Sequence, residues 1–248
     1  MGVTVTAPAG WREDVLALLP PGWEEGEAGA ARVHVSLGRA DGGYSIAADG
    51  LQATRARDRA GALRALDARM RAEIALHAPE LIFLHAGVAV IDGRAIVLPG
   101  STFTGKTTLV EALIRAGALY GSDEFAVLDA RGRVHPYAKP LSIRGPDLRA
   151  VRTPAAALGA GCATGPAPVG LVLVTEYRPG ARFDAQTLTS GEAVLRLLAH
   201  AVPAQTRPEQ TMAFLRAAVE GAEAWATSRG EADETAAIVL ASLPWRRG

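Results

Sequence analysis

Cysteine, lysine and long apolar runs are all scarce in this sequence, and each shortage excludes a class of protein. The single cysteine, Cys162, has no partner for an intrachain disulfide, which fits a reducing cytosol. No apolar run approaches the ~18 to 20 residues that a membrane helix needs, and the first residues lack a charged region followed by an apolar one. We therefore expect a cytoplasmic protein with no membrane partner.

The formal net charge of the chain is zero. The 26 basic and 26 acidic residues cancel, which argues against a nucleic acid or an acidic membrane surface as partner. Apolar residues are abundant: they make up 49% of the 248 residues, enough to fill a sizeable core. The chain is long enough for one large α/β domain or two small ones, and its Ala-, Arg- and Gly-rich composition is typical of a bacterial protein.

The first 78 residues predict a small N-terminal α+β segment. Residues 32–37 and 44–48 alternate apolar and polar side chains like two antiparallel strands around a Gly-containing turn. Residues 58–77 place apolar side chains at helical spacing between arginines, and Pro79 ends this helix. We therefore predict two domains, over residues 1–78 and 79–248.

Residues 79–248 predict an α/β domain. Two apolar strands, 81–91 and 94–100, are joined by Asp92-Gly93, which favours a tight hairpin because both residues accept positive φ. The elements expected after them are a helix over 106–116, short strands over 119–124 and 125–129, a loop over 150–168, a buried strand over 169–177, helices over 190–202 and 208–222, a strand over 224–230 and a helix over 232–243. Ser190 and Glu192 supply the predicted start of the helix over 190–202.

The residues between the second strand and the first helix of this domain match G-x-x-x-x-G-K-[ST] in full. This P-loop pattern also has its required context, a strand before it and a helix after it. The glycines let backbone N–H groups turn into one concavity, and the helix N-terminus adds positive potential there, which suits a polyphosphate. The predicted nucleotide-binding residues are Gly100, Ser101, Thr102, Phe103, Thr104, Gly105, Lys106, Thr107 and Thr108.

Lys106 and Thr107 carry the chemistry of this loop. Lys106 would reach the β- and γ-phosphates of ATP, and the Thr107 hydroxyl would join the ligands of a Mg²⁺ ion. Only two of the 26 basic residues are lysines, which leaves 24 arginines. A planar guanidinium does not replace a compact ammonium inside a loop that wraps phosphate, so a lysine at this position supports nucleotide binding.

A P-loop alone does not separate a kinase from other nucleotide-binding proteins. The base-reading string N-K-x-D of GTPases is absent, but Asp123 and Glu124 stand at the end of a short predicted strand. In a doubly wound sheet the carboxyl ends of strands line the same crevice as the P-loop, so we expect this acidic pair to face the γ-phosphate and the metal. Asp123 would accept the proton of an acceptor hydroxyl, and Glu124 would help to hold Mg²⁺. The alternative is a solvated turn.

Residues 85–129 resemble the catalytic core of the HPr kinase/phosphorylase family, P-loop serine kinases related in fold to phosphoenolpyruvate carboxykinase. The family pattern has a histidine on the strand before the hairpin, then the P-loop, a helix with a small turn, and an acidic pair, and this sequence presents all four in order. The resemblance implies an α/β P-loop kinase core of the HPr-kinase/carboxykinase type, with ATP and Mg²⁺ as cofactors. It also permits a homo-oligomer.

The resemblance implies a role for each matching residue. Lys106 and Thr107 match the phosphate and magnesium ligands, Asp123 matches the general base, and Glu124 matches the second acidic residue near the metal. His85 matches the histidine beside the phosphates, although a histidine within an apolar strand can also be a core residue.

Three departures from the family pattern limit what the resemblance implies. Glu124 stands where the family usually has a second Asp, and Ala86 separates His85 from the following glycine. The Arg-Gly-Leu-Gly signature that is associated with phosphorylase activity is absent. The resemblance therefore implies a kinase rather than a bifunctional regulator.

Three further cations are candidates for contact with phosphate or substrate: Lys139, Arg144 and Arg178. Lys139 and Arg144 belong to the segment over 134–144, and Arg178 follows the strand over 169–177. For Lys139 and Arg178 the alternative is a solvated position on the surface.

Three functions remain open at this point. The first is ATP- and Mg²⁺-dependent transfer of the γ-phosphoryl group to a hydroxyl, that of a serine in a protein or peptide. The second changes only the acceptor, to a small molecule or a modified peptide in a biosynthetic pathway. The third is a nucleotide-sensing module that does not turn over, which the replacement of Asp by Glu124 favours.

Overall fold

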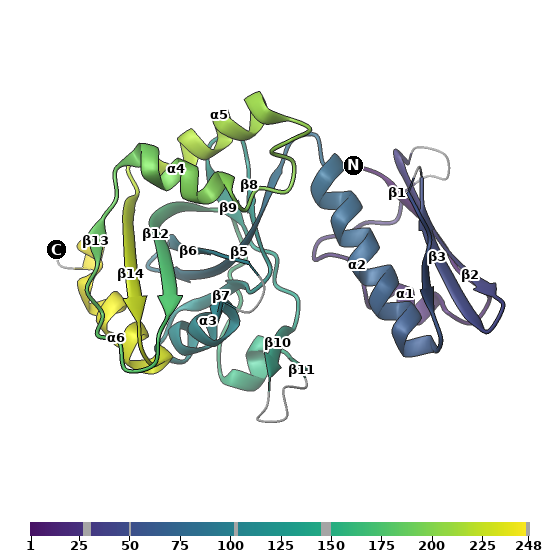
Figure 1. Ribbon diagram of the computed structural model, residues 1–248, viewed down its shortest axis with the longest axis horizontal. Helices are drawn as coiled ribbons and strands as arrows, with labels where there is room; N and C mark the ends of the chain where they lie inside the picture. Colours follow the sequence, from purple (N-terminus) through teal and green to yellow (C-terminus); the bar gives the residue numbers. More distant parts are fainter. Residues whose placement is uncertain (27–30, 50, 102–103, 145–149, 247–248) are drawn as a thin grey trace. The chain divides into compact units, whose positions relative to one another are not determined.

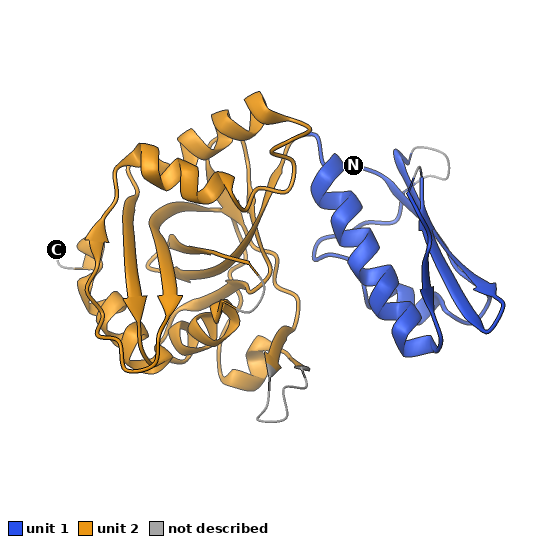
Figure 2. Ribbon diagram, viewed as in Figure 1, with its two compact units in different colours: residues 1–79 blue, residues 80–248 orange. Residues whose placement is uncertain are grey.

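The computed structural model describes residues 1–26, 31–49, 51–101, 104–144 and 150–246. It divides into two compact units, Met1–Pro79 and Glu80–Gly248 (Figure 2). The division falls one residue after the boundary expected from the sequence.

The first unit is a four-stranded sheet with a long helix packed on it (Figure 1). Its elements are β1 (Val3–Thr6), α1 (Arg12–Leu16), β2 (Val33–Ala40), β3 (Gly43–Ala48), β4 (Thr54–Ala56) and α2 (Arg59–His77). The predicted antiparallel strands and the helix are confirmed. Leu66 and Met70 of α2 pack with Val35 and Ile46 of the sheet, because the helical spacing of the apolar residues turns one stripe toward it.

The second unit contains an eight-stranded mixed sheet. Its strands are β5 (Ile82–Ile91), β6 (Arg94–Pro99), β7 (Leu119–Ser122), β8 (Phe125–Leu128), β9 (Arg133–His135), β12 (Ala167–Tyr177), β13 (Gln186–Thr187) and β14 (Glu223–Arg229). The order is β13-β14-β12-β6-β5-β8-β9, β7 also pairs with β5, and β12 also pairs with β9. The sheet is therefore mixed, since β5 runs antiparallel to β6, β7 and β8, and it differs in this from the doubly wound sheet used to place the strand ends.

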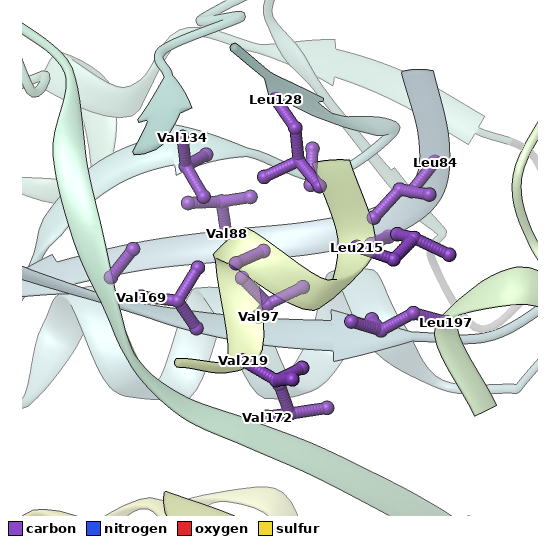
Figure 3. Packing of buried hydrophobic residues seen from close by; sticks show 14 of the residues in the cluster. Leu84, Val88, Val97, Leu128, Val134, Val169, Val172, Leu197, Leu215 and Val219 are labelled. Atoms are coloured by element: carbon purple, nitrogen blue, oxygen red, sulfur yellow. The ribbon is translucent and has the colours of Figure 1, made fainter. Parts of the chain in front are cut away.

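Helices pack on both faces of this sheet. The pair α3 (Lys106–Arg115) and α6 (Ala232–Ser242) shares one apolar cluster with the strands, and the pair α4 (Ser190–Leu198) and α5 (Pro208–Val219) shares another (Figure 1). The second cluster contains Leu197 and Leu215 of these helices together with Val97 and Val172 of the sheet (Figure 3). The sheet is buried from both sides, which explains why its central strands are near-continuous apolar runs.

The local predictions hold where turn chemistry is strong. The hairpin between β5 and β6 turns at Asp92 and Gly93 with φ of 50° and 73°, as expected. The helix over 190–202 is shorter than predicted, and its cap is Thr189 instead of Ser190: the Thr189 hydroxyl accepts from the Glu192 amide at 3.3 Å, while the Glu192 carboxylate accepts from the Thr189 amide at 2.8 Å.

The loop predicted over 150–168 is wrong in its first half. Strand β11 (Ala150–Thr153) pairs with β10 (Leu141–Arg144), and a short 3₁₀ helix spans Ala155–Leu158. A second 3₁₀ turn, Pro244–Arg246, follows α6. Within the described part of the chain, no helix combines the length and the hydropathy that a membrane crossing needs.

Candidate active site

The P-loop joins β6 to α3 at one edge of the large sheet. Strands β6, β7, β12 and β14 all end at this edge, because β5 is antiparallel to both β6 and β7 while β12 is parallel to both β6 and β14. Residues that follow these strand ends therefore gather near the first turn of α3. Thr102 and Phe103, two of the predicted loop residues, lie outside the described residues.

Two glycines shape the loop. Gly105 precedes α3 with φ of 79°, in the left-handed region that glycine enters without strain. A Cβ added to Gly105 would lie 2.4 Å from a guanidinium nitrogen of Arg229, and one added to Gly100 would lie 2.7 Å from the Thr104 hydroxyl. A side chain at Gly105 or Gly100 would therefore have to displace the Arg229 guanidinium or the Thr104 hydroxyl.

The Lys106 ammonium turns back into the loop. Its Nζ donates to the Ser101 carbonyl at 2.5 Å, and the Thr104 hydroxyl donates to the same carbonyl at 2.9 Å. Burial lowers the pKa of Lys106, and the carboxylate of Asp123 offsets part of that effect. Because a partly desolvated ammonium gains most from an anionic partner, the arrangement favours exchange of the carbonyl for a phosphate oxygen.

Asp123 is held against the start of α3 by donors from three elements. Its Oδ2 accepts from the Thr107 hydroxyl at 3.2 Å and from the Ser142 amide at 3.1 Å, and its Oδ1 accepts from the Tyr120 hydroxyl at 3.0 Å. The Tyr120 hydroxyl also lies 2.8 Å from the backbone carbonyl of Lys139. Asp123 is half-buried with fixed geometry, which differs from a carboxylate in a solvated turn.

The oxygen donors suited to Mg²⁺ meet at Thr107 and Asp123. Glu124 is half-buried, and its backbone holds the turn: the amide donates to the Ser122 hydroxyl at 3.1 Å and the carbonyl accepts from the Ala86 amide at 3.2 Å. Among the described residues no group of three or more His, Cys, Asp or Glu side chains could hold a metal by itself. The donors present fit a Mg²⁺ that arrives with a nucleotide and keeps phosphate and water as its other ligands.

His85 lies on β5 beside the loop and is exposed, so it is not a core residue. Its ring packs on Phe125, with centroids 5.0 Å apart and planes 33° apart. A cleft of about 240 Å³ opens here, lined by His85, Ser101, His200 and their neighbours Ala199, Ala201 and Val202. Burial lowers the pKa of His200, and the charge of Lys106 lowers it further, so His200 is a neutral imidazole near neutral pH.

A larger cleft of about 520 Å³ lies between α4 and α5, where Leu195 and Met212 line it. No predicted site residue is among the described residues that line this larger cleft. The smaller cleft is the better candidate, because two imidazoles line it together with Ser101, whose carbonyl accepts from Lys106.

Arg229 is a buried cation that supports the loop from the end of β14. It is only 2% exposed, and it donates to the Gly105 carbonyl and the Gly230 carbonyl, each at 3.0 Å. Its guanidinium lies over the Tyr177 ring at 5.3 Å, while its Nε finds no hydrogen-bond partner. Burial lowers the pKa of Arg229, and Tyr177 and Glu231 offset part of that effect.

The three further cations from the sequence lie in different places. Arg178 is exposed on the surface and pairs with Glu176 at 2.9 Å. Lys139 is buried, so the solvated alternative is wrong for it, and its backbone carbonyl lies beside the Tyr120 hydroxyl. Arg144 ends β10, and its side chain is outside the described part of the structure.

No sequence pattern predicted a place in the site for four residues: Tyr120, Ser142, His200 and Arg229. Tyr120 carries a usable signal, since a tyrosine three positions before Asp123 in a buried strand needs a partner for its hydroxyl. His200 and Arg229 lie 94 and 123 positions after Lys106 in the sequence, and only the order of the strands brings them to the loop.

Comparisons with known proteins find likenesses only among solved structures. No protein-family model matches the sequence, and no curated protein matches it either. Among solved structures, the chain is similar to the Hpr(Ser) kinase/phosphatase from Coxiella burnetii, with 16% identity and a TM-score of 0.38 over 66% of this chain and 95% of that one. A likeness of this size carries no argument about function, which therefore depends on the site itself.

Proposed function

We propose that this chain is an ATP- and Mg²⁺-dependent kinase that transfers the γ-phosphoryl group to a hydroxyl, that of a serine in a protein or peptide. The observation that carries the proposal is the fixed contact between Thr107 and Asp123 at the start of α3, with the Lys106 ammonium turned into the same loop. A phosphate-binding turn and a positioned carboxylate are the two parts that phosphoryl transfer requires.

The residues divide the work as follows. The backbone of the P-loop and Lys106 would hold the phosphates, and Thr107 and Glu124 would hold Mg²⁺, which neutralises charge on the β- and γ-phosphates. Asp123 would take the proton of the acceptor hydroxyl while that oxygen bonds to the γ-phosphorus. The bond from the γ-phosphorus to the β,γ-bridging oxygen breaks, and ADP leaves with its electron pair.

Support for Asp123 as the base comes from its donors. Thr107, Ser142 and Tyr120 fix both carboxylate oxygens, so the group keeps one orientation toward the loop. A base held in one orientation loses less entropy when the acceptor arrives, which is the usual source of positioning effects in catalysis.

The test is to incubate the protein with Mg²⁺ and ATP and a panel of serine peptides, small hydroxyl compounds and water alone, and to follow the products by phosphorus NMR. A new phosphomonoester resonance with equal formation of ADP is expected with a serine peptide. A phosphomonoester that forms only on a small molecule would show that the acceptor is a small molecule and not a serine peptide. Tight ATP binding without formation of ADP under any condition would identify a nucleotide sensor and refute the proposal.

A further inference from the structure

The cleft beside the P-loop has a wall that comes from outside the motif. Residues 199–202 follow α4 and are tied to β5: the His85 amide donates to the His200 carbonyl at 2.8 Å, and the Val202 amide donates to the Phe83 carbonyl at 2.9 Å. The Gly100 amide in turn donates to the His85 carbonyl at 3.2 Å. One backbone network thus fixes the start of the loop, β5 and the segment that carries His200.

The lining of this cleft suits an anion. It combines two imidazoles and Ser101 with Ala199, Ala201 and Val202, and none of the described lining residues is acidic. Ser101 lines this cleft together with His200, and its carbonyl accepts from the Lys106 ammonium, so the imidazole and the ammonium both lie beside Ser101. An uncharged imidazole beside an ammonium can donate one N–H without adding to the repulsion between cations.

The position of Lys106 indicates which phosphate would reach the cleft. A P-loop lysine contacts the β- and γ-phosphates, and here its Nζ lies against the carbonyl of Ser101, which itself lines the cleft. The cleft would therefore open beside the end of a phosphate chain bound at the loop, where ATP has a third phosphate and ADP has none.

We propose that His200 binds the terminal phosphoryl group of a nucleoside triphosphate and makes the site prefer the triphosphate over the diphosphate. The inference rests on the proposed function, because it takes the P-loop as a nucleotide site. It adds a phosphate-binding residue from the segment after α4. The reason for the preference is that the N–H of His200 meets a phosphate oxygen only when the third phosphate is present.

The test is an equilibrium titration with Mg²⁺ and either ADP or a triphosphate analogue that cannot be hydrolysed. His200→Ala should weaken binding of the analogue about tenfold and leave ADP within about twofold, because one hydrogen bond to a charged acceptor is lost. His200→Gln, which keeps a donor, should recover part of the loss. His34→Ala, an exposed histidine on β2 of the first unit, is the matched control and should change neither affinity.

A further variant separates packing from hydrogen bonding. His200→Leu fills the space without a donor, and it should show the same selective loss as His200→Ala even if the alanine variant folds poorly. Equal losses for both nucleotides, or no loss for either, would overturn the role of His200 while the wild type still binds both. A wild type that binds neither nucleotide would overturn the proposed function together with this inference.

Discussion

Substitution of Arg229 tests the shape of the loop without replacing any residue of the P-loop motif. Arg229→Met keeps most of the buried volume and removes the guanidinium that donates to the Gly105 carbonyl at 3.0 Å. A hydrogen bond to a charged group contributes about 1.5–3 kcal/mol, and about 1.4 kcal/mol corresponds to a factor of ten in affinity. We expect Arg229→Met to weaken ATP and ADP binding alike by at least about tenfold.

We expect Arg229→Met to change the stability of the fold less than it changes nucleotide affinity. The buried guanidinium makes no ion pair with a carboxylate among the described residues, so its removal also relieves a desolvation cost. We therefore expect the free energy of unfolding, measured in urea, to change by only about 1 kcal/mol.

The assay is calorimetric titration of each variant with ATP and with ADP. Arg246→Met removes an arginine that pairs with Asp92 on the surface at 2.9 Å, and as the matched control it should leave both affinities unchanged. Arg229→Lys keeps a charge without the planar fork and should fall between wild type and Arg229→Met. A folded Arg229→Met with wild-type affinity for both nucleotides would refute the view that this guanidinium shapes the loop.

Two further predictions concern hydrogen bonds near and far from the loop. Tyr120→Phe removes a buried hydroxyl that contacts Asp123 at 3.0 Å, and it should lower the free energy of unfolding by about 1–2 kcal/mol. Phosphoryl transfer should slow in this variant while ATP affinity stays within about twofold. An unchanged transfer rate would contradict the proposed role of this contact. The second prediction concerns Asp129, whose pKa burial raises. Hydrogen bonds from Arg133, His135 and the Arg131 amide outweigh that effect and hold the pKa below its usual range. A carboxyl with a lowered folded pKa adds stability above its unfolded pKa of about 3.9, and this contribution is lost as the pH falls through the folded pKa. Asp129→Asn should therefore cost about 1 kcal/mol at pH 7, after allowance for solvent screening, and less at pH 3, whereas a deficit independent of pH would show that the charge is irrelevant.

Local patterns were sufficient for much of the fold. The hairpin at Asp92-Gly93, the helix that begins at Lys106 and the helix over 59–77 each depend on residues close in sequence, and the structure has all three. The pairing of β10 with β11 was missed because β11 directly precedes residues 154–168, which are rich in Ala, Gly and Pro, and composition alone indicates a loop there. The cap at Thr189 was missed by one position, since Ser190 offers the same chemistry.

Long-range pairings, which local patterns do not encode, matter more for the site than for the fold. Lys106, Thr107 and Asp123 could be expected to meet, because the turn after a short strand returns to the head of the helix before it. His200 and Arg229 reach the loop through the pairing of Ala201 with Leu84 and the place of β14 beside β12, which are long-range pairings that no local pattern encodes. The sheet is also mixed, yet its strand ends still converge because β6 and β7 both run antiparallel to β5.

The central claim is that Asp123 acts as the base of a phosphoryl transfer, and Asp123→Asn tests it most directly. The amide oxygen of asparagine can still accept from Thr107 and Ser142, so the loop should keep its shape and ATP should bind within about threefold. The amide cannot take a proton, and single-turnover transfer to the best acceptor from the phosphorus NMR panel should fall by about a hundredfold or more. Transfer at the wild-type rate by a variant that binds ATP normally would contradict the account.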